Sequence, residues 1–197
     1  MVQVLLIRPG ATTFDVEGRI KGSLDIPLSE QGEAQARNLA RMLADEKLDC
    51  LYVAPAESAR QSAEFIAERN FVKQKSMDCL RNLDHGLWQG KLVSEVKRLQ
   101  PRVYRQFQEH PTEVCPPGGE TVMDAVGRVR RSVEKLVKKH KHGRIGILVP
   151  QPLASIVKSV LTGADLGDLW KSELDFGTYE SVCVESRSAL IGSVALT

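Results

Sequence analysis

Aliphatic residues occur along this chain either in short unbroken runs or in longer stretches where they recur every three or four positions. The unbroken runs at residues 4–7, 50–53 and 145–149 are typical of strands buried on both faces of a sheet. Two later runs, residues 181–184 and 190–194, also predict strands.

The longer stretches predict helices. Ser29 has a side chain suited to capping a helix N-terminus, and the apolar positions that follow it have helical spacing up to Leu43. Residues 93–110 have a helical pattern in which Pro101 is expected to start, end or kink a helix. The other predicted helices cover residues 59–67, 120–140 and 153–161.

Strands that alternate with helices of about 10–15 residues indicate a largely parallel sheet covered by helices on both faces. We therefore predict an α/β protein of three-layer α/β/α architecture with a mostly parallel central sheet. The 197 residues contain no internal repeat, no low-complexity segment and no long linker. Residues 1–197 are expected to form a single domain, large enough to fold without a disulfide or a metal.

Composition narrows the functional class. The net charge of +2 is too small to indicate a nucleic-acid-binding protein by itself. No apolar run approaches the roughly 18 residues of a transmembrane helix, and residues 1–8 lack the leader of a signal peptide. The cysteines form no C-x-x-C pair and have no histidine at zinc-binding spacing. We expect a cytoplasmic protein with reduced thiols, no metal and no cofactor.

In a sheet of this kind, ligands bind where strands end and helices begin, which directs attention to residues 8–14, 54–61 and 150–153. These segments and their neighbours contain several distinctive blocks. They read LIRPGAT at 6–12, GR at 18–19, GSLDIPLSEQG at 22–32, APAESARQSAE at 54–64, LRNLDHGLWQG at 80–90, PGGET at 117–121 and VPQPL at 149–153.

In register from residue 3 to about residue 163, these blocks resemble the phosphoglycerate-mutase-like branch of the histidine phosphatase superfamily. The resemblance implies the family's fold and its chemistry, which is phosphoryl transfer through a phosphohistidine. In that chemistry one histidine attacks the phosphorus, while two arginines and a second histidine neutralise the oxygens. A glutamic acid protonates the leaving oxygen.

The resemblance assigns each of these roles to a position in this chain. Arg8 occupies the position of the first arginine. Pro9 stands at the position of the nucleophile, where it offers neither a nucleophilic side chain nor a backbone N–H. Ser58 stands at the position of the second arginine, Asn82 at that of the acid and Gln151 at that of the second histidine. Four of the five central residues of the family therefore differ here.

A carboxylate also stands where the family often has an asparagine, at Asp15. We expect Asp15 or another nearby carboxylate to neutralise Arg8, and Lys21 is a candidate cation on the rim of the pocket. No catalytic residue is assigned. The candidate binding residues are Arg8, Asp15, Lys21, Ser58, Asn82 and Gln151.

Other residues near these positions could take over a lost role. His85 follows Asn82 by three positions, in a predicted loop, and is interpreted as a partly exposed surface residue. Arg60 follows Ser58 by two positions, so on a helix it points roughly 200° away, onto a solvated face. Asp84 could act as an acid, but is interpreted as making a structural hydrogen bond.

Basic residues also gather at the end of the predicted helix over residues 120–140. Cations are favoured at a helix C-terminus by the helix dipole, which explains them without a function. The alternative is a patch for an acidic partner, a membrane surface or nucleic acid, and the absence of interleaved aromatic residues argues against nucleic acid. The residues are Lys135, Lys138, Lys139, His140, Lys141, His142 and Arg144.

Together these features predict a pseudoenzyme, a histidine-phosphatase fold that binds a small ligand or a protein partner and performs no phosphoryl transfer. The alternative is a phosphatase or phosphomutase-like enzyme with weak or rerouted activity on phosphate monoesters. No membrane association is expected, and the size of the chain is compatible with a homodimer.

Overall fold

The computed structural model describes residues 1–140, 142–172 and 175–184 and places five strands in one sheet, in the order β3-β2-β4-β1-β5. Strands β1 to β4 are parallel, and β5 pairs antiparallel with β1 at one edge. The predicted α/β class and mostly parallel sheet are confirmed. The strand expected at residues 190–194 lies outside the described residues. The strands are β1 (Val2–Ile7), β2 (Cys50–Val53), β3 (Gln74–Ser76), β4 (Arg144–Leu148) and β5 (Tyr179–Val184).

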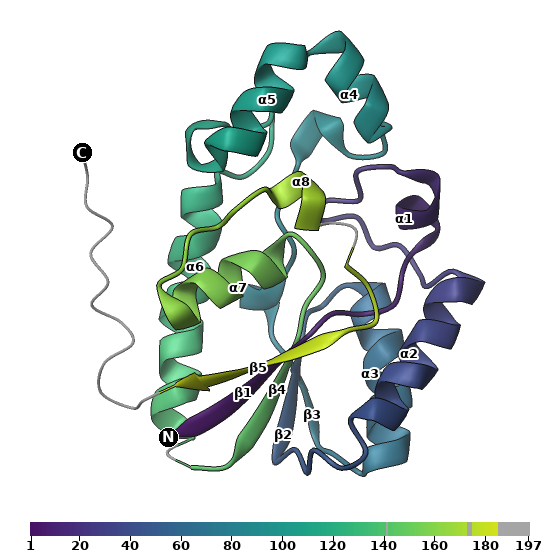
Figure 1. Ribbon diagram of the computed structural model, residues 1–197, viewed down its shortest axis with the longest axis vertical. Coiled ribbons are helices and arrows are strands. Elements are labelled where there is room, and N and C mark those ends of the chain that lie inside the picture. Colours follow the sequence, from purple (N-terminus) through teal and green to yellow (C-terminus); the bar gives the residue numbers. More distant parts are fainter. Residues whose placement is uncertain (141, 173–174, 185–197) are drawn as a thin grey trace.

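Helices cover both sides of this sheet, as predicted. Figure 1 shows α2 (Glu30–Met42) and α3 (Glu57–Asn70) on one side, and α6 (Val122–Lys139) and α7 (Leu153–Thr162) on the other. Ser29 caps α2 as expected, because its hydroxyl accepts a hydrogen bond from the Gly32 N–H at 3.0 Å. The result is the three-layer arrangement that the alternation of strands and helices predicts.

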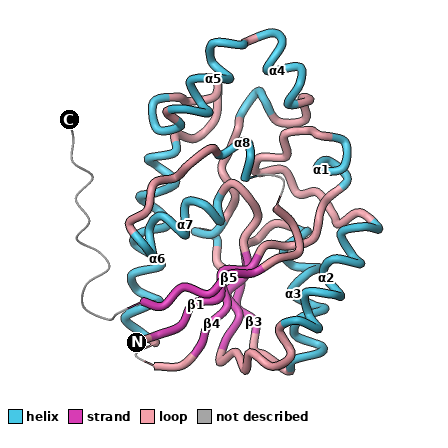
Figure 2. Tube along the Cα trace, viewed as in Figure 1, coloured by secondary structure: helices cyan, strands magenta, loops and turns pink. Residues whose placement is uncertain are grey.

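A helical cap lies beyond the carboxyl ends of the parallel strands. It consists of α4 (Val93–Leu99), α5 (Pro101–Glu109) and α8 (Leu169–Ser172), and Figure 2 shows the loops that connect it to the sheet. Pro101 starts α5, which is one of the outcomes expected for it. The sequence pattern did not predict α8 or the short helix α1 (Thr13–Glu17).

Five aromatic rings pack together under this cap, and we call them the cap cluster: His85, Trp88, Tyr104, Phe107 and Trp170. The Trp170 ring centroid lies 5.0 Å from that of Phe107 and 5.2 Å from that of Tyr104. Phe107 also lies 5.9 Å from His85 and from Trp88. Because α5 supplies Tyr104 and Phe107 and α8 supplies Trp170, the cluster joins the cap to the loop that follows β3.

The prediction that His85 is partly exposed is wrong, because its side chain is fully buried in the cap cluster. The Asp84 carboxylate accepts a hydrogen bond from the Gly86 N–H at 2.8 Å, and this tight turn directs His85 inward and Leu87 outward. Burial lowers the pKa of His85 from 6.5 to about 4. The imidazole is therefore neutral at pH 7.

His85 should make the protein sensitive to acid. Between pH 6.5 and 4, the unfolded chain binds a proton at this position and the folded chain does not, so folding stability falls as the pH falls. His85→Phe keeps a ring in the cluster and removes the titration. We expect the free energy of unfolding of the wild type to fall by roughly 3 kcal/mol more than that of His85→Phe across this window.

Urea denaturation at several pH values measures this difference. His110→Phe, at the exposed end of α5, is the control variant. Parallel pH profiles for the wild type and His85→Phe would contradict the assignment of a buried, neutral imidazole.

Candidate functional site

The candidate site lies at the carboxyl ends of the parallel strands. Arg8 follows β1, Gln151 follows β4, and Ser58 lies in the first turn of α3, after β2. Since these strands are neighbours in the sheet, the segments that follow them converge at one edge. Asn82 reaches the same edge from the loop after β3, and its amide contacts the backbone of Gln151.

Arg8 is neutralised, as expected, but not by Asp15. Its Nε lies 2.9 Å from a carboxylate oxygen of Asp175, and its Nη2 forms an ion pair with Glu180 of β5. Its Nη1 donates to the Thr178 hydroxyl at 3.4 Å. The two ion pairs and the hydrogen bond of this largely buried guanidinium therefore come from one segment near the C-terminus of the described chain.

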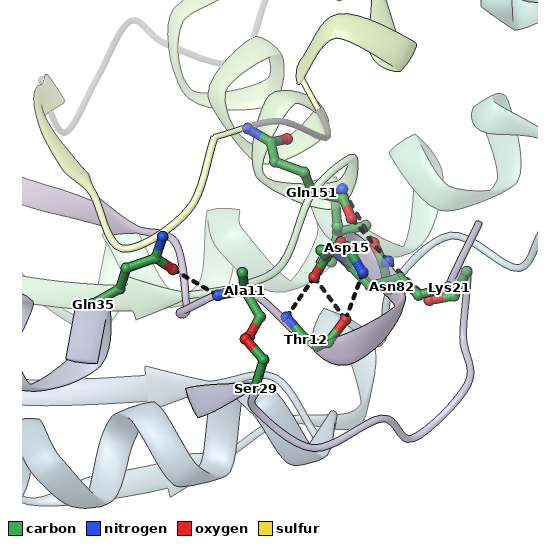
Figure 3. Close-up of polar contacts among 10 residues, drawn as sticks. Ala11, Thr12, Asp15, Lys21, Ser29, Gln35, Asn82 and Gln151 are labelled. Carbon is green, nitrogen blue, oxygen red and sulfur yellow. Dashed lines mark hydrogen bonds and ion pairs between the residues drawn. The ribbon is translucent and has the colours of Figure 1, made fainter. Parts of the chain in front are cut away.

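Asp15 instead pairs with Lys21. The Lys21 Nζ lies 2.5 Å from Asp15 Oδ1, and the two side chains are only 7% and 5% exposed. Asp15 Oδ2 also accepts hydrogen bonds from the backbone N–H and the hydroxyl of Thr12, which completes a capping box at the start of α1. Figure 3 shows these contacts converging on Asp15. Lys21 was expected on the rim, but it is buried beneath it because its charge is satisfied internally.

The Asn82 side chain joins three loops. Its Nδ2 donates to the carbonyls of Gly22 and Gln151 at 2.9 and 3.0 Å, and its Oδ1 accepts from the Leu153 N–H at 3.3 Å. This pattern needs an amide, which donates and accepts at once. A glutamate at this position could not donate to the two carbonyls.

Gln151 uses its side chain in a similar way. Its Oε1 accepts hydrogen bonds from the backbone N–H and the hydroxyl of Ser155, at 3.2 and 3.0 Å. Figure 3 shows this side chain extending away from Asp15 and Asn82. Together, Gln151 and Asn82 satisfy two of the N–H groups at the start of α7, where a phosphate could otherwise bind.

Arg128 is a supporting residue that the sequence interpretation missed. It is almost buried, it donates to the carbonyls of Cys79 and Asn82 at 2.7 and 3.2 Å, and it forms a two-point ion pair with Glu120. Arg128 therefore positions the loop that presents Asn82. Glu120 lies in the family block at residues 117–121, but nothing in the sequence pattern indicated that Arg128 is its partner.

The remaining candidates stay apart from these contacts. Ser58 is buried in α3, and no hydrogen bond or ion pair in the described part of the chain joins it or Arg8 to the other four candidate residues. Arg60 is exposed and pairs with Glu57 and Asp25, as expected for a solvated face. Asp84 makes the structural hydrogen bond that was expected of it.

An open cleft of about 420 Å³ lies beside Asp15, with Arg19, Tyr104, Trp170 and Lys171 among its lining residues. The residues that the structure describes contain no group of three or more histidine, cysteine or acidic side chains placed to hold a metal ion. Among the same residues, no helix is long and apolar enough to cross a membrane. The four cysteines are unpaired.

Comparison with known families identifies the scaffold. Residues 4–194 match the model of the histidine phosphatase superfamily, branch 1. The chain belongs to this superfamily. It is 31% identical over 197 residues to "Phosphoserine phosphatase 1" of Hydrogenobacter thermophilus, an alignment that covers 100% of this chain and 93% of that protein.

Two further similarities agree with this assignment. The chain is 28% identical over 148 residues to the "Metal-independent phosphoserine phosphatase" of Arabidopsis thaliana, which covers 74% of this chain and 62% of that protein. The solved structure of "Bacillus stearothermophilus YhfR" has the same fold, with a TM-score of 0.84 and 23% identity, over 96% of this chain and 94% of that one.

These similarities correct the function expected from the sequence. A pseudoenzyme that only binds a ligand or partner was predicted from the residues at positions 9, 58, 82 and 151. That prediction is contradicted, because proteins similar to this histidine phosphatase superfamily member are named as phosphatases. The alternative, an enzyme with weak or rerouted activity on phosphate monoesters, agrees better with them.

Asn82 should be required for stability. Asn82→Ala leaves two buried carbonyls and one N–H without their partner, and each unpaired group costs roughly 1–3 kcal/mol. We therefore expect urea denaturation to show a loss of about 3 kcal/mol. The matched control is Asn38→Ala on the exposed face of α2, which should change stability by less than about 0.5 kcal/mol. Equal midpoints for the two variants would show that the Asn82 bonds do not hold the loops.

Proposed function

We propose that this protein is a phosphatase that acts weakly on small phosphate monoesters and that its reaction does not pass through a phosphohistidine at position 9. We infer that four central catalytic positions of the family are replaced, by Pro9, Ser58, Asn82 and Gln151. The observation that carries the proposal is the Arg8 guanidinium, which lies at the carboxyl end of β1 where the family binds phosphate.

Arg8 is suited to binding a phosphoryl group. A guanidinium presents its N–H groups in a planar fork that matches two phosphate oxygens, and it stays charged at any pH the protein experiences. Arg8 is only 8% exposed, so a phosphate bound to it would be shielded from water and salt. Arg8 would thus neutralise charge on the phosphate oxygens while a water oxygen bonds to the phosphorus, the ester P–O bond breaks, and the leaving oxygen takes up a proton that the water gives off.

The expected rate is low for the same structural reasons. The saturated ring of Pro9 has no nitrogen that can accept a phosphoryl group, and Asn82 has no acidic proton to give to the leaving oxygen. Enzymes from which the catalytic unit has been removed retain an acceleration of roughly 10³–10⁴-fold over water through binding and electrostatics. Because we infer that the second arginine and the second histidine are also replaced, we expect a smaller acceleration at this site.

The substrate is proposed to be small. The cleft beside Asp15 has a volume of about 420 Å³ and combines aromatic rings with the charged residues Arg19 and Lys171. We propose that this cleft, whose lining includes Asp15 but not Arg8, takes the organic part of a small metabolite. Two of the similar proteins are named for phosphoserine, so O-phosphoserine is the first natural compound to test beside an aryl phosphate.

We also propose a cytoplasmic location. The four unpaired cysteines support it, because two of them are exposed and would be prone to oxidation outside a reducing compartment.

The proposal predicts phosphate release that depends on Arg8. Arg8→Ala should reduce release from an aryl phosphate and from O-phosphoserine by at least about tenfold, since a charged hydrogen bond to phosphate contributes roughly 1.5–3 kcal/mol. Arg37→Ala removes an exposed arginine that pairs with Glu33 and is the matched control. Release that is equal in the wild type and in Arg8→Ala, or that never exceeds the uncatalysed rate, would overturn the proposal.

A second measurement tests the route. No acid-labile phosphate should form on the wild-type protein during turnover, because position 9 has no imidazole. Pro9→His restores an imidazole and leaves the hydrogen bonds of Asn82 and Gln151 intact, so it should accumulate acid-labile phosphate if Arg8 places the phosphorus nearby. Acid-labile phosphate on the wild-type chain would show that another histidine acts as the nucleophile.

A further inference from the structure

Two carboxylates hold Arg8 in place, and we call Asp175 and Glu180 the carboxylate clamp. Asp175 lies 2.9 Å from Arg8 Nε, and Glu180 pairs with Nη2. Asp175 also accepts a hydrogen bond from the Thr178 hydroxyl at 2.8 Å, and the same hydroxyl accepts from Arg8 Nη1. None of these clamp residues lies in the sequence blocks that resemble the family.

The backbone fixes the clamp next to Arg8. The Arg8 N–H donates to the carbonyl of Thr178 at 2.9 Å, and the Gly177 N–H donates to the carbonyl of Pro9 at 2.9 Å. In the antiparallel ladder, Glu180 lies opposite Leu6. Because side chains two positions apart on a strand point to the same face, Glu180 and Arg8 share a face of the sheet.

The carboxylate clamp competes with phosphate for the positive charge of Arg8. Two carboxylates and one hydroxyl face a single guanidinium. A phosphate that approaches Arg8 meets two negative charges and must compete with them for the guanidinium. The clamp therefore opposes a dianion more strongly than a monoanion.

Glu180 has a second ion-pair partner, so it can release Arg8 without losing all of its charge pairing. Its other carboxylate oxygen lies 2.6 Å from the Nζ of Lys158, which α7 presents from the neighbouring layer. If phosphate took Arg8, Glu180 would keep this ion pair and would not be left as an unpaired charge. Asp175 is 42% exposed, so water can stabilise it after displacement.

We propose that Asp175 and Glu180 determine the affinity and charge selectivity of the phosphate site by competing with phosphate for Arg8, and that Lys158 holds Glu180 when phosphate binds. This inference rests on the proposed function, in which Arg8 binds the phosphoryl group. It adds the residues that limit binding, which the family resemblance does not contain.

Calorimetric titration of the full chain with inorganic phosphate tests the clamp. Asp175→Asn and Glu180→Gln each remove one competing charge and keep the shape of the side chain, so each should tighten phosphate binding by about tenfold or more. Lys158→Ala should weaken binding, because Glu180 then has only Arg8 as a partner. Glu33→Gln makes the same charge change in an exposed ion pair on α2 and should leave phosphate affinity unchanged.

The outcomes separate this inference from the proposed function. The inference is overturned if neither Asp175→Asn nor Glu180→Gln binds phosphate more tightly than the wild type and Glu33→Gln. It is also overturned if the double variant that carries both clamp substitutions binds no phosphate. Phosphate release that still depends on Arg8 would leave the proposed function standing in that case. Urea denaturation checks that each variant is folded. If Glu180→Gln is not, Asp175→Asn at the more exposed position decides the question.

Discussion

The pairing of β1 with strands on both sides is the constraint on which the site depends. β4 lies parallel to β1, so the residues after these two strands emerge at the same edge of the sheet. β5 lies antiparallel on the other side of β1, so the chain enters β5 at the edge where β1 ends. Arg8 therefore has the start of α7 on one side and the residues that lead into β5 on the other. The contacts of Arg8 follow from this arrangement.

Within that arrangement, neutral amides occupy positions where the family resemblance places ionisable groups. Asn82 holds the loops through two donated hydrogen bonds that a carboxylate could not make, and Gln151 accepts hydrogen bonds at the start of α7. Their side chains make hydrogen bonds within the protein, whereas Arg8 and Lys21 form ion pairs with carboxylates. The site is thus internally balanced in charge, and a phosphate must compete with groups that the protein itself supplies.

Membership of the histidine phosphatase superfamily indicates the type of reaction, whereas the residues of the site indicate its route and rate. The family match and the similar proteins named as phosphatases favour action on phosphate esters. In the function that we propose, Pro9 and Asn82 replace the nucleophile and the proton donor of the phosphohistidine pathway and so determine the route and the rate. The proposed weak phosphatase centred on Arg8 agrees with both the family match and these residues.

Local sequence patterns predicted most of the strands and helices of the fold. The apolar runs of β1, β2 and β4, the Ser29 cap and the break at Pro101 all act through neighbours a few positions away, so their outcome is visible in the local pattern. The family blocks located Arg8, Asn82 and Gln151 at the edge of the sheet for a related reason, since each block follows a strand or a turn. In contrast, β3 is only three polar residues long and has no such pattern.

The ion-pair partners and the burial of the site's side chains could be seen only in the tertiary structure. The Arg8 partner Glu180 is 172 positions away in the chain, and no local periodicity relates the two. Burial of His85 and Lys21 likewise depends on α5, α8 and α1 closing over them. Ion pairs and burial are set by which distant segments meet, and that is a property of the packed sheet and its cap rather than of any stretch of sequence.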